Sequence, residues 1–286
     1  MNMNWGHSNF QGQPTSRRQF LKTSAVASAA LAMPAILSRN AGAAENGETL
    51  RIGLIGCGGR GTGAASQALQ ADPNTVLVAL ADAFPEPVAK SLDSLQKQKA
   101  IADRVKVPPE KQFVGLDAYQ KLIDSGVDVV LQGAPPGFRP AHVRAAVIAG
   151  KHQFVEKPIA TDAVGVRSVL ESARMAAEKK LAWVAGLCWR YDTARREFFQ
   201  QIHSGAIGDI RAIYATYLTG PVKPMPPASQ RPAGMGDVEW QLRHWYNFVW
   251  VCGDGLVEQA VHSVDKVMWA MQDVPPLKAV ASGGRQ

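Results

Sequence analysis

Apolar and polar positions along most of the chain follow two different repeats. Short apolar runs, typical of buried strands, alternate with longer segments whose apolar positions recur at the spacing of a helix. Strands are expected at residues 50–55, 75–81, 127–131, 153–155 and 181–185. Helices are expected at residues 62–70, 86–100, 118–123, 141–149 and 162–179. This alternation predicts an α/β fold with a doubly wound parallel sheet and right-handed crossovers.

The pattern changes after residue 190. A helix is expected at 194–203, and residues 210–218 alternate in the manner of a half-exposed strand. The segment 220–236 contains five prolines and is expected to be irregular, and a last helix is expected at 256–271. We therefore predict three parts: a removed segment at 1–43, a dinucleotide-binding domain at 48–187 and a second domain at 188–286.

The first residues have the layout of a bacterial twin-arginine export signal. Arg17 and Arg18 precede a bulky apolar pair, and an uncharged stretch follows at 23–37. Residues 41–43 have the small-x-small pattern found at the end of such a signal. The alternatives are a transmembrane anchor and a basic amphipathic helix. The apolar stretch has 15 residues, whereas spanning a bilayer takes ~20. We predict export to the periplasm by the twin-arginine machinery, with no membrane association once the signal is removed.

Composition argues against several other functions. The signal contains four basic residues and no acidic one, namely Arg17, Arg18, Lys22 and Arg39. Removing these four from the 31 basic residues leaves 27 against 24 acidic residues, too small an excess to favour nucleic acid. The chain has three cysteines, at positions 57, 188 and 252, without the spacing of a metal site. We expect no metal and no disulfide, and a packing role for these cysteines.

A glycine-rich loop directly follows the first expected strand and opens a helix. Its glycines are Gly56, Gly58, Gly59 and Gly61, and Arg60 lies between the last two. In a dinucleotide loop the first glycine allows a tight turn, the next lets the backbone approach the pyrophosphate, and the last lets helix and strand pack closely. The pyrophosphate then meets free N–H groups at the helix start. The alternative is a glycine-rich turn without a ligand.

The expected second strand ends at an acidic residue that bears on the choice of cofactor. Asp82 lies 21 residues after Gly61, where a carboxylate accepts hydrogen bonds from the adenosine ribose hydroxyls. Because a carboxylate repels a 2′-phosphate, NAD is favoured over NADP. The Arg60 guanidinium could bind either phosphate group, so NADP stays possible. Twin-arginine export suits proteins that take up a cofactor in the cytoplasm, so we expect the nucleotide to be tightly held.

Candidate acid/base residues occur at two places. Lys157, in the sequence Glu156-Lys157-Pro158, ends the strand at 153–155 and should face the crevice at the carboxyl edge of the sheet. Loss of solvation there favours the neutral amine and allows proton exchange near neutral pH. The alternative is a surface lysine in a turn. Glu258 and His262 lie four residues apart on one helix face, where the carboxylate could hold the imidazole tautomer.

Aromatic residues cluster between positions 240 and 250. Trp240, Trp245 and Trp250 alternate with polar residues, a combination that suits the C–H face and hydroxyls of a sugar. The alternative is that these rings belong to the core or to a subunit interface. We include Trp245 among the candidate substrate-binding residues.

These features together resemble the Gfo/Idh/MocA family, named for glucose–fructose oxidoreductase and inositol dehydrogenase. The resemblance begins near residue 49 and continues to the end of the chain. The segments that carry it are the glycine loop, residues 149–158, residues 204–208, and Glu258 with His262 and Asp265. It implies a Rossmann domain followed by an α+β substrate domain with a large open sheet, which often forms the interface of a homo-oligomer. Members are longer than this chain, so we expect a truncated sequence in which several strands of that sheet are missing.

The resemblance also implies residue roles. Lys157 and His262 would be the acid/base groups of an oxidoreductase that moves a hydride between NAD and a secondary hydroxyl of a sugar, polyol or sugar derivative. Glu258 would orient His262, although this position is commonly aspartate in the family. The remaining candidates are Pro135, His142 and Glu156 for the cofactor, and Arg190 and Tyr191 for the substrate. Two alternatives are an NAD-dependent glycoside hydrolase, in which we would expect Lys157 to be replaced, and a non-catalytic nucleotide-binding protein.

Overall fold

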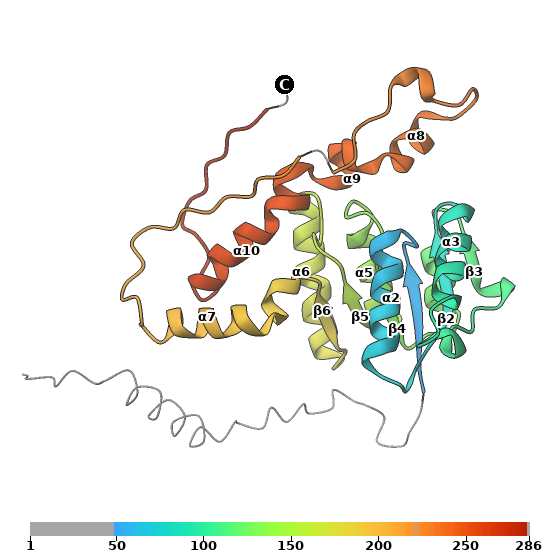
Figure 1. Cartoon of the computed structure of the whole chain (residues 1–286), viewed down its shortest axis with the longest axis horizontal. Coiled ribbons are helices and arrows are strands. Elements are labelled where there is room, and N and C mark those ends of the chain that lie inside the picture. The colour runs from blue at the N-terminus through green and yellow to red at the C-terminus, as the bar shows by residue number, and fades with distance from the viewer. Residues whose placement is uncertain (1–48, 221, 285–286) are drawn as a thin grey trace, which may run out of the picture. The chain divides into compact units, whose positions relative to one another are not determined.

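The computed structural model describes residues 49–220 and 222–284, and the predicted signal at 1–43 lies outside them. Its centre is a sheet of six parallel strands in the order β3-β2-β1-β4-β5-β6 (Figure 1). The strands are β1 (Leu50–Ile55), β2 (Thr75–Asp82), β3 (Gln112–Val114), β4 (Val129–Gln132), β5 (His152–Val155) and β6 (Trp183–Ala185). Strand order reverses between β1 and β4, which is the point where doubly wound sheets bind ligands. The predicted fold class is confirmed.

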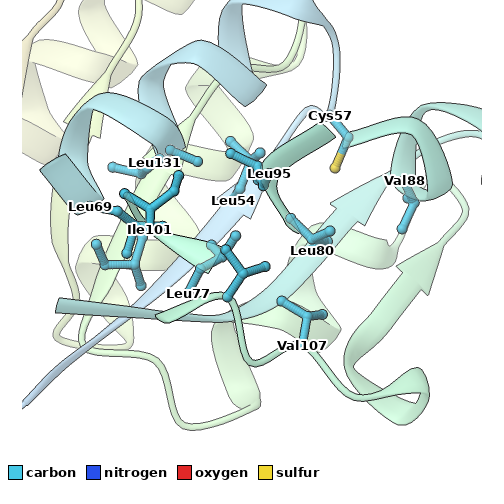
Figure 2. Packing of buried hydrophobic residues seen from close by; sticks show 13 residues of the cluster. Leu54, Cys57, Leu69, Leu77, Leu80, Val88, Leu95, Ile101, Val107 and Leu131 are labelled. Carbon is cyan, nitrogen blue, oxygen red and sulfur yellow. The ribbon is translucent and has the colours of Figure 1, made fainter. Parts of the chain in front are cut away.

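Helices connect the strands and cover the sheet. They are α2 (Gly59–Ala71), α3 (Pro85–Gln96), α4 (Ala118–Asp124), α5 (Arg139–Ile148) and α6 (Ala163–Glu178), with the short 3₁₀ turns η1 (Ala102–Arg104) and η2 (Pro109–Lys111) before β3. Side chains alternate across a strand, so Leu54 and Ile55 of β1 belong to different core clusters. Leu54 packs with residues of α2 and α3, including Leu69 and Leu95 (Figure 2). Ile55 packs with residues of α4, among them Leu122.

The predicted elements of this domain are present, with shifted ends. The helix predicted at 86–100 ends at Gln96, and the strand predicted at 127–131 occupies Val129–Gln132. Strand β3 was not predicted, because three residues are too few to show an alternating pattern. It forms an edge of the sheet and pairs only with β2.

The second part of the chain is mostly helical and irregular in the described residues. Its elements are η3 (Cys188–Tyr191), α7 (Thr193–His203), η4 (Ala228–Gln230), α8 (Asp237–Arg243), η5 (Trp245–Asn247), α9 (Val249–Cys252), the π-helix η6 (Leu256–Ala260) and α10 (Val261–Ala270). Helices α7 and α10 lie side by side (Figure 1). The ring of Phe199 in α7 stacks on that of Trp269 in α10, with centroids 4.0 Å apart. The helix predicted at 256–271 is therefore η6 continued by α10.

The strand predicted at 210–218 is wrong for the described structure. Residues 210–218 carry no helix or strand assignment, and no ladder joins them to another described segment. Ser263 donates a hydrogen bond to the Thr216 carbonyl, and the Tyr217 hydroxyl donates to Gln259. Tyr214 and Leu218 are more than nine-tenths exposed. An alternating pattern predicts side-chain direction, but a strand also needs a partner for its backbone groups.

The described residues contain no helix that is both long and apolar enough to cross a membrane.

Cys57, Cys188 and Cys252 are all free thiols, and Cys57 belongs to the core cluster that includes Leu54 (Figure 2). Cys252 is also buried, whereas Cys188 is exposed. Burial and the nearby Asp82 carboxylate raise the pKa of the Cys57 thiol, which keeps it protonated.

Candidate functional site

The glycine loop lies at the carboxyl end of β1, and its glycines serve two purposes. A side chain at Gly56 would come within 2.3 Å of the Ala134 amide nitrogen, and one at Gly61 within 1.9 Å of the Gly56 carbonyl oxygen. Gly56 also has a φ of +88°, which disfavours any side chain. Gly58 and Gly59 instead face open space. Two of the glycines are thus required by packing, and the other two leave room for a ligand.

Helix α2 begins at Gly59 and has no side-chain cap at Gly58. The free N–H groups of its first turn are therefore available to an anion. Together with the space beside Gly58 and Gly59, this arrangement fits a dinucleotide pyrophosphate. The described residues have the features that such a cofactor requires at the loop.

Asp82 joins the end of β2 to the glycine loop. Its Oδ2 accepts a hydrogen bond from the Cys57 amide at 2.8 Å, and its Oδ1 accepts one from the Phe84 amide at 3.1 Å. Burial raises the pKa of this carboxyl group, while the amide hydrogen bonds lower it. Each carboxylate oxygen has further acceptor capacity, so the group can still receive a ribose hydroxyl.

Arg60 is directed toward β5 rather than toward Asp82. Its Nε lies 3.0 Å from Glu156 Oε1, and its guanidinium also donates to Gln67 at 2.7 Å. Since β1 and β4 separate β2 from β5 in the sheet, this ion pair is on the other side of the crevice from Asp82. Burial raises the pKa of Glu156, and the nearby Arg60 and Arg139 charges act against this rise.

A cavity of about 610 Å³ extends along the glycine loop, within the ordinary range of ligand sites. Every predicted cofactor residue except Glu156 lines it: Gly56, Gly58, Gly59, Arg60, Gly61, Asp82, Pro135 and His142. From the second part of the chain, Arg243, Trp245 and Tyr246 line it as well. Of the three predicted substrate residues, the cavity wall includes Trp245 but not Arg190 or Tyr191.

His142 of α5 is a buried, neutral imidazole beside this cavity. Its ring stacks on Tyr119 with centroids 4.2 Å apart and lies near Phe138. Burial, followed by the Arg139 charge, lowers the pKa of His142 to about 4. Its Nδ1 has no hydrogen-bond partner among the described residues.

Lys157 and Glu258 form a partly buried ion pair. The predicted catalytic residues Lys157, Glu258 and His262 are not among the residues that line the cavity. Lys157 Nζ lies 3.0 Å from Glu258 Oε1 and also donates to the Glu258 main-chain carbonyl. The Tyr246 hydroxyl donates to the same Oε1 at 3.0 Å. Glu258 Oε2 is buried without a partner among the described residues. The Lys157–Pro158 peptide, which follows β5, is cis.

The structure differs from the prediction that Glu258 orients His262. The hydrogen bonds of the Glu258 side chain are to Lys157 and Tyr246, because a buried carboxylate is stabilised most by a cationic and a hydroxyl donor. The His262 ring instead packs against the rings of Trp189, 4.8 Å away, and Tyr217, 6.5 Å away, between centroids. Burial and then the Lys157 charge lower the pKa of His262.

Arg190 is already bound to carboxylates. Its guanidinium lies 2.8 Å from Asp265 and 2.6 Å from Asp273, and hydrogen bonding to both raises its pKa. It therefore ties η3 to α10 and the residues after it. Tyr191 is 61% exposed. Both remain predictions as substrate residues, and Arg190 would have to act from within this ion-pair network.

Two residues at the site were not predicted. Arg139 is only 3% exposed, and its guanidinium donates to the carbonyls of Ala134 and Pro158. Burial lowers the pKa of Arg139 to about 10. An arginine in the first turn of a helix has no pattern that reveals burial. Tyr246 lies in the aromatic segment at 240–250, but its hydrogen bond to Glu258 depends on tertiary packing. No cluster of histidine, cysteine or acidic residues suited to a metal occurs in residues 49–220 or 222–284.

The strand order and the glycine loop define a domain of the dinucleotide-binding Rossmann class. Residues 50–185, just under half of the chain, match the Gfo/Idh/MocA family model described as "Oxidoreductase family, NAD-binding Rossmann fold". Residues 14–34 match the twin-arginine translocation pathway signal sequence. The chain therefore carries a signal for export by that route.

Three known proteins illustrate the similarity. A dTDP-3,4-didehydro-2,6-dideoxy-alpha-D-glucose 3-reductase of Streptomyces violaceoruber is 28% identical over 64% of this chain and 48% of its own. Glycosyl hydrolase family 109 protein 2 of Shewanella sp. is 26% identical over 71% of this chain and 46% of its own. The crystal structure of scyllo-inositol dehydrogenase from Lactobacillus casei with NAD(H) and scyllo-inositol has a TM-score of 0.54 and 21% identity, covering 78% of this chain and 56% of its own.

The structural similarity at this identity concerns the fold alone. The chain spans about half the length of the curated relatives that it matches. The relatives include sugar-related reductases and dehydrogenases, so the oxidoreductase class is supported while the substrate is not specified.

Proposed function

We propose that this protein is a nicotinamide-dependent oxidoreductase that moves a hydride between the cofactor and a secondary hydroxyl of a sugar, polyol or sugar derivative. The Lys157–Glu258 pair carries the proposal, because it holds a positioned amine and is joined by a hydrogen bond to Tyr246, which lines the cavity that contains the glycine loop. The sugar-related reductases and inositol dehydrogenases among the relatives support the substrate class.

Charges near the end of β2 favour NAD over NADP. Asp82 lies at the end of β2, and Glu86 and Glu239 flank Arg243 there. Three carboxylates against one guanidinium disfavour an added 2′-phosphate. Arg60, the other candidate for a phosphate, is paired with Glu156 across the sheet. When bound, the nicotinamide would accept or supply the hydride.

Lys157 and His262 would have different roles in proton transfer. Lys157 would donate a hydrogen bond to the reacting oxygen, held in place by the carboxylate and carbonyl of Glu258. His262 has a lowered pKa and is therefore neutral near pH 7, ready to accept a proton. Glu258 would thus orient Lys157 rather than His262. Trp245, stacked on Tyr246 with centroids 4.0 Å apart, offers a ring face to the C–H side of a sugar.

The glycoside hydrolase alternative rests on the Shewanella relatives. To separate the two reactions, the purified protein is incubated with NAD and a panel of sugars and polyols, and separately with aryl glycosides. Net NADH formation with a sugar supports the proposal. Aryl glycoside cleavage without net NADH would assign the hydrolase reaction. Bound nucleotide with neither reaction would assign a binding protein.

We also propose a periplasmic location, a homo-oligomer and a tightly held cofactor that is recycled by a second substrate. The export signal supports the location. It also supports tight retention of the cofactor, because free nucleotide is scarce outside the cytoplasm. Denaturation of protein purified from the periplasmic fraction should release a stoichiometric amount of nicotinamide dinucleotide. If the denatured protein releases no nucleotide unless nucleotide was added beforehand, tight retention is contradicted.

A further inference from the structure

One short stretch of the second part of the chain runs along the wall of the cavity that contains the glycine loop. This wall of the cavity contains Arg243, His244, Trp245 and Tyr246. The glycine loop and Asp82, from the first part of the chain, line the same cavity. Arg243 ends α8, and Trp245 begins η5. We call residues 243–246 the crossing segment.

The Arg243 end of the crossing segment contacts the end of β2 and the start of α3. Its guanidinium carbon lies 4.0 Å from the centre of the Phe84 ring. One guanidinium nitrogen is 3.4 Å from Glu86, and Nε is 2.9 Å from Glu239 of the same helix. Phe84 lies two residues after Asp82, and its amide donates a hydrogen bond to Asp82 Oδ1 that closes the turn. Arg243 is therefore close to the turn after Asp82, the carboxylate predicted to receive the adenosine ribose.

The Tyr246 end of the crossing segment contacts the Lys157–Glu258 ion pair. The Tyr246 hydroxyl donates to Glu258 Oε1, the oxygen that also binds Lys157. Between the two ends, the side chains support one another: Trp245 stacks on Tyr246, and the His244 ring packs 4.1 Å from that of Trp240. His244 Nδ1 also lies 2.9 Å from the Trp240 carbonyl oxygen. The crossing segment thus lines the cavity from Arg243 to Tyr246 and links it, through the Tyr246 hydroxyl, to the Lys157–Glu258 ion pair.

We propose that the crossing segment is a clasp that retains the dinucleotide, and that the contact of Arg243 with Phe84 and Glu86 holds the clasp closed. This inference rests on the proposed function, since it assumes a nicotinamide dinucleotide in the cavity. A cofactor held below the crossing segment can leave only after Arg243 separates from α3. The contacts of Arg243 therefore set the rate of release, while the glycine loop and Asp82 set most of the affinity.

The test measures how fast bound NADH leaves the full chain. The protein is loaded with NADH, mixed with excess ADP-ribose, and the loss of bound-NADH fluorescence is followed in stopped flow. Arg243→Gln should accelerate release about three- to tenfold, the size expected for losing one partly exposed ion pair and one cation–π contact. Glu86→Gln should accelerate it less, because the contact with Phe84 remains.

Arg195→Gln is the matched control. Arg195 also combines an ion pair, with Asp192, and a ring contact, with Trp189 at 5.0 Å, but it does not line the cavity. Its release rate should equal that of the wild type. The double variant of Arg243 and Glu86 should release NADH no faster than Arg243→Gln alone, because both substitutions break the same contact.

Two results would overturn the clasp. One is an unchanged release rate in Arg243→Gln, and the other is fully additive effects of the Arg243 and Glu86 substitutions. Either result with normal NADH binding leaves the proposed function intact. Wild-type protein that binds neither NADH nor ADP-ribose would instead contradict the proposed function itself, so the two failures are distinguishable.

Discussion

Lys157 binds two acceptors of a single residue, the side-chain carboxylate and the main-chain carbonyl of Glu258, which lies 101 positions further along the chain. This double contact joins the end of β5 to η6. It fixes the amine at the border between the Rossmann domain and the rest of the chain. Neither residue could hold this geometry without the other, because a buried charge needs its partner.

Replacing Lys157 tests its proposed acid/base role. Lys157→Met keeps the length of the side chain and removes the exchangeable proton. Turnover should fall by roughly 10²–10⁴, the range for loss of one positioned acid/base group. NAD affinity, measured by calorimetry, should stay within a few-fold because the glycine loop and Asp82 are untouched. Near-normal turnover would make Lys157 a structural residue.

The same substitution should change the titration of His262. Burial and the positive charge of Lys157 both lower the pKa of His262, so the imidazole is neutral near pH 7 and becomes protonated only at lower pH. In Lys157→Met the charge is gone, so the pKa of His262 should rise and protonation should begin at higher pH. Histidine NMR titration measures this. His142, whose pKa is lowered by burial and by Arg139, is the internal control and should not move.

Two glycines of the loop should respond differently to substitution. Gly58 has an extended backbone and open space beside it, so Gly58→Val should fold normally while its side chain occupies the pyrophosphate position. Nucleotide binding should be lost with the melting temperature nearly unchanged. Gly61→Ala should instead destabilise the domain by about 1–3 kcal/mol through overpacking, since its Cβ would lie 1.9 Å from the Gly56 carbonyl oxygen. Normal binding by Gly58→Val would reduce the loop to a structural turn.

Asp82→Asn tests cofactor selectivity. The amide removes the negative charge and keeps the shape, so the affinity for NADP relative to NAD should rise roughly tenfold, or ~1.4 kcal/mol. Stability should fall by about 1–2 kcal/mol, because Asp82 accepts from two backbone amides and an asparagine has one acceptor oxygen. Asp128→Asn, which breaks an ion pair with Arg51 elsewhere, is the control and should not change the ratio. An unchanged ratio in Asp82→Asn would remove Asp82 from the ribose site.

Local features were predictable from the sequence, and contacts distant along the chain were not. The glycine loop and Asp82 follow directly from strands whose apolar runs are clear, so their shared cavity could be predicted. The burial of Arg139 and the bond from Tyr246 to Glu258 depend on how helices pack against the sheet. A spacing of four residues suggested that Glu258 would face His262, yet a stronger donor from β5 binds the carboxylate.

The ion pair of Arg60 with Glu156 has a consequence for protein engineering. A loop grafted from another protein without Arg60 would remove one of the cations that offset the burial of Glu156, which is 8% exposed. The loop and the turn that contains Lys157 therefore form one exchangeable module, and a graft that replaces only the loop would disturb the chemistry it was meant to preserve.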